Sequence, residues 1–231
     1  MNKKIELQEL GFKDYKETWD YQEQIFKGIL DIKVKNRREE TSVKTNNYFL
    51  FVEHPHVYTF GKSADKNNLL INPEFLKKIN AEVFETERGG DITYHGPGQI
   101  VAYPIFDLDK FFTDIHKYMR YLEEAVIKTL AHFQITATRY EGLTGVWIDA
   151  ETPRARKICA MGVKCSRWIT MHGIALNVAP DLGYFGNIVP CGIQDKAVTS
   201  MAQELGRAVT IAEVQQVLLQ EMATVFNFSI Q

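Results

Sequence analysis

The chain has 231 residues, of which 45% are hydrophobic, 12% aromatic and 24% charged, as in an ordinary globular protein. A formal net charge of −2 provides no global basic field, so nucleic acid is not expected as a partner. No apolar run approaches the ~18 residues of a membrane span, and the N-terminus lacks the apolar core of a signal peptide. We therefore expect no membrane association and a cytoplasmic location, where the three cysteines would be reduced thiols. No zinc-ligand spacing occurs, so no metal is expected.

Apolar spacing and capping residues predict the helices. An amphipathic helix is expected over 13–30, followed by an exposed loop over the polar run 33–47. Asn72 and Pro73 predict the start of a short helix with Phe75, Leu76 and Ile79 inward. The longest helix is expected from 111 to about His132. Two more are predicted near the C-terminus: one capped by Asp195 and ending at Gly206, and one opened by a Thr210–Glu213 capping box.

Runs rich in β-branched and aromatic residues predict the strands. The predicted strands lie within 48–54, 81–87, 100–108, 145–150, 158–166 and 169–178. The run ICAMGVKCS (158–166) is nearly continuous in apolar or small residues, which indicates a strand buried on both faces. Because several strands follow one another directly, we expect an α+β fold, a mixed β-sheet with flanking helices. The prediction is a single domain over 1–231, in which 195–231 is a helical C-terminal part.

RGGDITYHGPGQ (88–99) carries more glycine than a turn requires. Its spacing matches neither a Walker loop nor a dinucleotide-binding loop, which argues against a phosphate site. A β-hairpin that uses glycine for positive φ remains open, although a hairpin does not need glycines on both sides of its turn.

Cys191, between a proline and a glycine, is the best candidate for a nucleophile, because loops display functional side chains. A helix predicted to follow it would favour the thiolate. Cys159 and Cys165 lie in an apolar strand pattern and are expected to be inert core residues. Lys157, next to a buried strand, is either a solvated strand-edge residue or an acid/base whose pKa desolvation lowers.

Five segments taken together resemble the octanoyltransferases of lipoate assembly, the lipoyl(octanoyl) transferases that use acyl carrier protein. The matching segments are VEHPHVYTFGK (52–62), RGGDITYHGPGQIVAYPIFDL (88–108), GVWID (145–149), RKICAMGVKCSRWITMHGIALNV (156–178) and NIVPCGIQDKAVTSM (187–201). They span most of the chain in the family's order. The resemblance implies a fold like the catalytic module of lipoate and biotin protein ligases. Cys159 and Met161 depart from the smaller or aliphatic residues common in the family.

The resemblance implies that Cys191 is the acyl-thioester nucleophile and that Lys157 is the general acid/base. It also implies that three segments line the acyl pocket. These substrate-binding residues are Arg88, Gly89, Gly90, Asp91, Ile92, Thr93, Tyr94, His95, Ala160, Met161, Gly162, Gly173, Ile174 and Ala175. Arg88 and His95 are expected to hold the shape of residues 88–99, the glycine stretch, and its glycines are expected to make room for the acyl chain. His95 and His172 are either structural residues or residues that orient the acyl head.

The implied reaction moves an octanoyl group from octanoyl-acyl carrier protein to a lysine ε-amine of a lipoyl domain. The acceptors would be the lipoyl domains of 2-oxoacid dehydrogenase complexes and the glycine cleavage H protein. Because a thioester becomes an amide, the reaction is downhill, and no ATP or other cofactor is expected. Burial and a cationic neighbour such as Arg156 would lower the pKa of Lys157 towards neutrality. Oxyanion donors near Gly192 or in 160–162 stay open, and we expect a monomer.

Other functions compete with this one. An ATP-dependent lipoate ligase would share the fold but need no cysteine. A non-catalytic homologue that binds lipoyl domains would transfer nothing. A papain-type thiol hydrolase would release free octanoate, but its local cysteine signature is absent.

Overall fold

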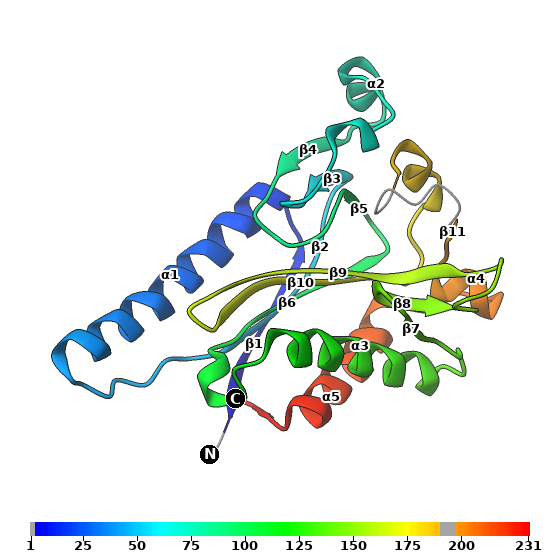
Figure 1. The fold of residues 1–231 in the computed structure, drawn as a ribbon. Helices are drawn as coiled ribbons and strands as arrows, with labels where there is room; N and C mark the ends of the chain where they lie inside the picture. The colour runs from blue at the N-terminus through cyan, green and yellow to red at the C-terminus, as the bar shows by residue number, and fades with distance from the viewer. Residues whose placement is uncertain (1–2, 190–196) are drawn as a thin grey trace.

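The computed structural model describes residues 3–189 and 197–231, so Cys191 and Asp195 lie outside the described residues. Most strands form one large mixed sheet with the order β12-β1-β2-β6-β10-β9-β8-β7, and β11 pairs with β9 (Figure 1). Its strands are β1 (Lys4–Phe12), β2 (Tyr48–Glu53), β6 (Gln99–Ile105), β7 (Thr138–Tyr140), β8 (Leu143–Ile148), β9 (Arg156–Ser166), β10 (Ile169–Asn177), β11 (Ala197–Val198) and β12 (Ser229–Ile230). A second, small sheet has the order β4-β3-β5 and consists of β3 (Val57–Phe60), β4 (Glu82–Glu85) and β5 (Thr93–His95).

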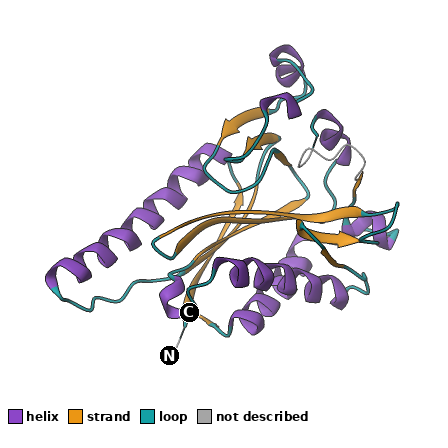
Figure 2. Cartoon of the chain, in the orientation of Figure 1, coloured by secondary structure: helices purple, strands orange, loops and turns teal. Residues whose placement is uncertain are grey.

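Helices cover both faces of the large sheet (Figure 2). The α-helices are α1 (Tyr15–Glu39), α2 (Pro73–Lys78), α3 (Ile115–His132), α4 (Met201–Leu205) and α5 (Ile211–Phe226). Short 3₁₀ turns occur at η1 (Lys66–Asn68), η2 (Leu108–Lys110) and η3 (Leu182–Asn187). The mixed strand directions and the segregated helices confirm the α+β prediction.

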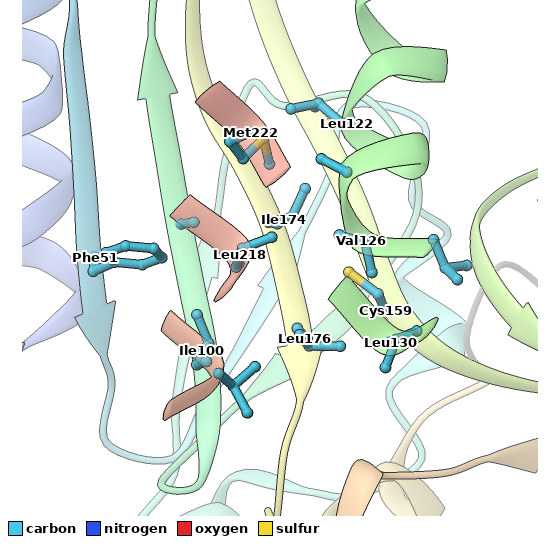
Figure 3. Close-up of a cluster of buried hydrophobic side chains, with 14 of the residues drawn as sticks. Phe51, Ile100, Leu122, Val126, Leu130, Cys159, Ile174, Leu176, Leu218 and Met222 are labelled. Atoms are coloured by element: carbon cyan, nitrogen blue, oxygen red, sulfur yellow. The ribbon is translucent and has the colours of Figure 1, made fainter. Parts of the chain in front are cut away.

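Each face of the sheet has its own hydrophobic core. On one face, Phe26 and Ile29 of α1 pack against residues of β2, β6 and β10. On the other face, α3 and α5 bury a larger cluster that contains Leu122, Leu218 and Cys159 (Figure 3). Strands β6 and β10 are buried along their whole length because helices cover both of their faces.

The helix predictions were right in position but not in extent. α1 continues to Glu39, so the predicted loop 33–47 is helical in its first half. This run is polar because it is exposed, yet it consists largely of good helix formers, and Lys33 is anchored by Asp107 at 2.6 Å. As a result α1, with 25 residues, is longer than α3, with 18, although α3 ends at His132 as predicted.

Caps were predicted more reliably than burial. Asn72 caps α2, the Thr210–Glu213 capping box opens α5, and Gly206 ends α4 in the left-handed conformation. Phe75, predicted to point inward, is 40% exposed. The helix expected to follow Asp195 begins instead at Met201, after the short strand β11, and Ser200 is its N-cap.

The prediction that the strand over 158–166 is buried on both faces is wrong, and the following strand, β10, is the buried one. In β9 only Ile158 and Cys159 are fully buried, whereas every residue of its neighbour β10 is. β10 lies inside the large sheet between β6 and β9, whereas β9 lies towards the edge, where only the short strands β8, β7 and β11 follow it.

Candidate active site

The glycine stretch 88–99 links the two sheets. Its first strand, β5, pairs with β3 in the small sheet, whereas β6 pairs with β2 and β10 in the large one. The hairpin interpretation is therefore wrong. The chain passes from the small sheet to the large one at Gly98, where only glycine fits. Its φ is +83°, and a Cβ there would lie 2.4 Å from the carbonyl oxygen of Ala179.

Arg88 holds this stretch in shape. Its side chain is 7% exposed and donates hydrogen bonds to the backbone oxygens of Gly89 at 3.0 Å, Thr59 at 2.6 Å and Asp91 at 2.8 Å. A buried guanidinium that donates to three main-chain carbonyls fixes the path of the backbone. The predicted shaping role of Arg88 is thus confirmed by its hydrogen bonds.

A cavity of about 550 Å³ lies between the glycine stretch and the large sheet. Its lining brings the glycine stretch together with residues of the paired strands β9 and β10, which are distant from it in the sequence. The predicted residues that line it are Arg88, Gly89, Gly90, Asp91, Ile92, Thr93, His95, Lys157, Ala160, Met161, Gly162, Gly173, Ile174 and Ala175. A cavity of this size suits a small apolar group held by a few polar side chains.

Tyr94 is the predicted pocket residue that does not line the cavity. Its hydroxyl lies 2.8 Å from Nδ1 of His56 and its ring stacks on Tyr184, so it belongs to the core of the small sheet. Strand alternation explains this, because neighbouring residues of β5 face opposite sides.

Several lining residues had not been predicted. They include Tyr15, Ser63, Val101, Tyr103, Met119, Gly142, Leu143, Thr144, Val163, Asn177, Phe185 and Val198. Tyr15 lies in the amphipathic helix expected over 13–30, and nothing in that pattern marks it as a pocket residue. Tyr103 and Asn177 sit within strand patterns, and Ser63 lies in a turn after β3, so none of the three gives a local sequence signal for a pocket.

Not all of the glycines in the wall make room for a substrate. A Cβ at Gly173 would lie 2.2 Å from the carbonyl oxygen of Ala102, so the neighbouring strand β6 requires this glycine. A Cβ at Gly89 would meet only the carbonyl oxygen of Val163, at the ordinary distance of 3.5 Å. At Gly89, unlike Gly173, packing within the protein does not require a glycine, which leaves close approach of a ligand as the reason for it.

A β-bulge brings Lys157 to the cavity. Across the β8–β9 pair, Val146 lies opposite Cys159 and Trp147 opposite Lys157, which leaves Ile158 as the extra residue. Ile158 and Cys159 both pack into the core on the α3 side, whereas Lys157 and Ala160 line the cavity.

Lys157 is held between two strands. Val198 of β11 pairs with it on one side and Trp147 of β8 on the other. Its Nζ lies 4.7 Å from the centroid of the Trp147 ring, a cation–π contact. Arg156 does not supply the cationic neighbour suggested from the sequence, because Glu204 at 2.5 Å and Asp149 at 2.7 Å compensate its charge.

Both ends of the segment that contains Cys191 are fixed next to this cavity. Before it, the amide of Val189 donates to the carbonyl oxygen of Asn68 at 2.8 Å, and the side chain of Asn68 donates to Asp91 at 2.7 Å. After it, Val198 lines the cavity. The helix expected directly after Cys191 does not support the nucleophile assignment, since β11 precedes α4.

Two buried histidines, His95 and His172, line the cavity, and a third, His54, lies behind them against His95 and Tyr103. Burial lowers the pKa of His95 to about 3, of His172 to about 3 and of His54 to about 4, so all three are neutral near pH 7. His172 lines the cavity, has a φ of +60°, and its buried Nε2 has no hydrogen-bond partner within the described residues. Strain and an unsatisfied polar atom at one cavity residue are typical of functional sites.

The other cysteines do not form a second reactive site. Cys159 is fully buried, and this burial raises the pKa of its thiol well above the usual range. Cys165 is half-buried, and its thiol pKa is raised for the same reason. Inert behaviour is thus supported for both. Within 3–189 and 197–231, no group of three or more metal-ligating side chains is found, and no helix is long and apolar enough to cross a membrane.

The fold places this site in a known class of proteins. The chain superimposes on a bipartite lipoate protein ligase from Thermoplasma acidophilum with a TM-score of 0.73 at 16% identity, over 99% of this chain and 86% of that one. A biotin protein ligase from Aquifex aeolicus gives a TM-score of 0.53 at 13% identity, over 97% and 71% of the two chains. The architecture is therefore that of the catalytic module of lipoate and biotin protein ligases.

Sequence comparison identifies the family within this class. Residues 14–223 match the lipoyl protein ligase A/B catalytic domain. The chain is 64% identical to an octanoyltransferase of Christiangramia forsetii over 98% of this chain and 97% of that protein. It is 62% identical to one of Flavobacterium psychrophilum over the full length of both. The chain belongs to the octanoyltransferase family and is an acyltransferase.

Proposed function

We propose that the chain transfers an octanoyl group from acyl carrier protein to lipoyl domains through a thioester on Cys191, with Lys157 as general acid/base. The supporting observation is the cavity that Lys157 lines, because both ends of the segment containing Cys191 are fixed beside it. The acceptors of the octanoyl group in this proposal are the lipoyl domains of 2-oxoacid dehydrogenase complexes and the glycine cleavage H protein.

In the first half-reaction the thiolate of Cys191 attacks the donor thioester. The bond between the acyl carbon and the carrier's sulfur breaks, and protonated Lys157 gives its proton to the departing thiolate. One thioester replaces another, so this step requires little driving force.

In the second half-reaction the ε-amine of the acceptor lysine attacks the acyl-enzyme. Neutral Lys157 takes a proton from the attacking nitrogen, and the Cys191 thiolate leaves as the amide forms. The pairing of Lys157 with β8 and β11 and its contact with the Trp147 ring hold the side chain at the cavity for both steps.

Intact mass spectrometry after incubation with octanoyl-acyl carrier protein tests the nucleophile. The wild type should gain one octanoyl group, and Cys191→Ala should gain none. Cys165→Ala is the matched control, since it removes a half-buried thiol and should still be acylated. Equal acylation of Cys191→Ala would overturn the assignment, and release of free octanoate without transfer would indicate a hydrolase.

A further inference from the structure

Two buried amide side chains connect the glycine stretch to the strand beside Lys157. Gln99 is 1% exposed and Asn177 is 4% exposed. They lie opposite each other on β6 and β10, and Nε2 of Gln99 donates to Oδ1 of Asn177 at 2.9 Å. Because buried amides are costly unless they are fully satisfied, the remaining partners of this pair define its role.

The orientation of both amides is set by main-chain carbonyls, which can only accept hydrogen bonds. Nδ2 of Asn177 lies 3.0 Å from the carbonyl oxygen of Thr199, so Oδ1 must face Gln99. Nε2 of Gln99 also lies 3.2 Å from the carbonyl oxygen of Tyr94, so Nε2 is the donor on that side and Oε1 faces His95.

That orientation fixes the tautomer of His95. Oε1 of Gln99 lies 2.7 Å from Nδ1 of His95, and an amide oxygen can only accept, so Nδ1 carries the hydrogen. The neutral ring then has its lone pair on Nε2. Since His95 lines the cavity, the ring offers a hydrogen-bond acceptor to a bound substrate.

The other end of the chain of hydrogen bonds reaches Lys157. The amide of Thr199 donates to the carbonyl oxygen of Lys157 at 3.0 Å, and the carbonyl of Thr199 accepts from Asn177. Thr199 directly follows β11, so Asn177 fixes this strand against the strand that carries Lys157. His95 and Lys157 are thereby connected by one set of buried contacts.

We infer that Gln99 and Asn177 are positioning residues for acyl transfer, which hold His95 as an acceptor for an N–H of the attacking lysine amine while Lys157 takes the proton. The inference rests on the proposed function. The amine carries two hydrogens when it attacks: one goes to Lys157, and the other is held by His95 Nε2. His95 accepts this hydrogen bond without taking the proton, so the ring is in the same neutral form before and after the reaction.

The tautomer is measured directly by ¹⁵N NMR of the histidine rings in the substrate-free protein, with the His95 signal assigned from His95→Gln. Wild type should show Nδ1 protonated and Nε2 unprotonated, and Gln99→Met should lose this preference. An Nε2–H tautomer in the wild type would overturn the inference. Because no substrate is needed, failure of the Cys191 proposal would leave this result interpretable.

Single-turnover kinetics test the positioning role. Gln99→Met and Asn177→Ala should slow transfer from a preformed acyl-enzyme to a lipoyl domain by about tenfold, the worth of one hydrogen bond. Acylation of Cys191 should change less, by about threefold at most, since it involves no amine. Asn47→Ala is the matched control: Asn47 is equally buried and accepts from the amide of Asp107, away from the cavity. Equal slowing of both half-reactions, or the same pattern in Asn47→Ala, would overturn the role.

Discussion

Lys157 and Ala160 face the same cavity although they lie three positions apart on one strand. In a regular strand these two residues would point to opposite faces. Because of the bulge at Ile158, the consecutive side chains of Ile158 and Cys159 both point into the core. Lys157 and Ala160, on either side of them, therefore face the same way. The placement of the proposed acid/base thus depends on a local irregularity of the sheet, as is common next to active sites.

Lys157→Met should keep the fold and slow both half-reactions by about 10²-fold to 10⁴-fold, because general acid/base catalysis contributes on that scale. The methionine retains the unbranched stem that packs beside Gly145 and Trp147. Acylation and transfer rates should be measured together with the thermal midpoint. Lys164→Met is the control, since this lysine of the same strand pairs with Glu87 and does not line the cavity. Equal rates in Lys157→Met and wild type would refute the acid/base role.

Ala160→Leu should shorten the acyl chain that the enzyme prefers. Strands advance about 3.3 Å per residue, so with the bulge Ala160 lies roughly 7 Å and Gly162 roughly 13 Å beyond Lys157. An extended acyl chain covers about the same length per bond as an extended peptide, in which three backbone bonds span roughly 3.5 Å. The seven carbon–carbon bonds of the octanoyl group therefore span roughly 8 Å. The octanoyl chain would therefore pass over Ala160 and end before Gly162, where Arg88 and Gly89 close the space.

The larger side chain of Ala160→Leu should reduce kcat/KM for the octanoyl donor by at least about 10-fold to 200-fold, the discrimination expected of a single methylene. A butanoyl donor is the internal control and should be affected little. A uniform loss with donors of both lengths would show that Ala160 does not set the chain length.

Much of the fold and site could be predicted from the sequence because the signals are local. Caps such as Asn72 and Thr210 act within one helical turn, and strand runs are short and rich in β-branched residues. The pocket segments were found through the family resemblance, and the structure brings them together around one cavity.

What could not be predicted depends on partners distant in sequence. Asn177 looks like an ordinary strand residue and Gln99 like the last residue of the glycine stretch, and only the register of β6 and β10 pairs them. The extent of α1 was missed because its polar C-terminal half is stabilised by Asp107, a residue of another element. Tyr94 was misassigned because a continuous motif does not reveal which of its residues face the ligand.

Gly89→Ala and Gly98→Ala should separate a substrate effect from a folding effect. The added methyl at Gly89 meets ordinary contact distances, so the free energy of unfolding should change by less than about 0.5 kcal/mol while KM for the octanoyl donor rises. At Gly98 the positive φ and the carbonyl of Ala179 leave no room, so unfolding should become easier by about 1–3 kcal/mol. Urea denaturation and steady-state kinetics check both variants. A large stability loss in Gly89→Ala would make this glycine a structural residue.

Stability should fall on acidification because of the buried neutral histidines. His54 is fully buried, and its Nδ1 lies 2.8 Å from the carbonyl oxygen of Lys13 and its Nε2 2.9 Å from the hydroxyl of Tyr103. Its pKa is about 4 in the folded chain, because burial disfavours the charged ring, and about 6.5 when unfolded. Between these values the unfolded state binds more protons, so the stability present above pH 6.5 is lost as the pH falls towards 4.

Replacing His54 by glutamine removes this titration while keeping a neutral hydrogen-bonding side chain. The slope of the unfolding free energy against pH between 6.5 and 4 should decrease by about 1 kcal/mol per pH unit, close to the value for one proton. The variant's absolute stability at pH 7 will be lower where the glutamine packs less well, but the slope is independent of that loss. His116→Gln, at an exposed position on α3, is the control and should run parallel to the wild type. Parallel urea-derived curves for His54→Gln and wild type would mean that His54 is already able to bind a proton in the folded chain.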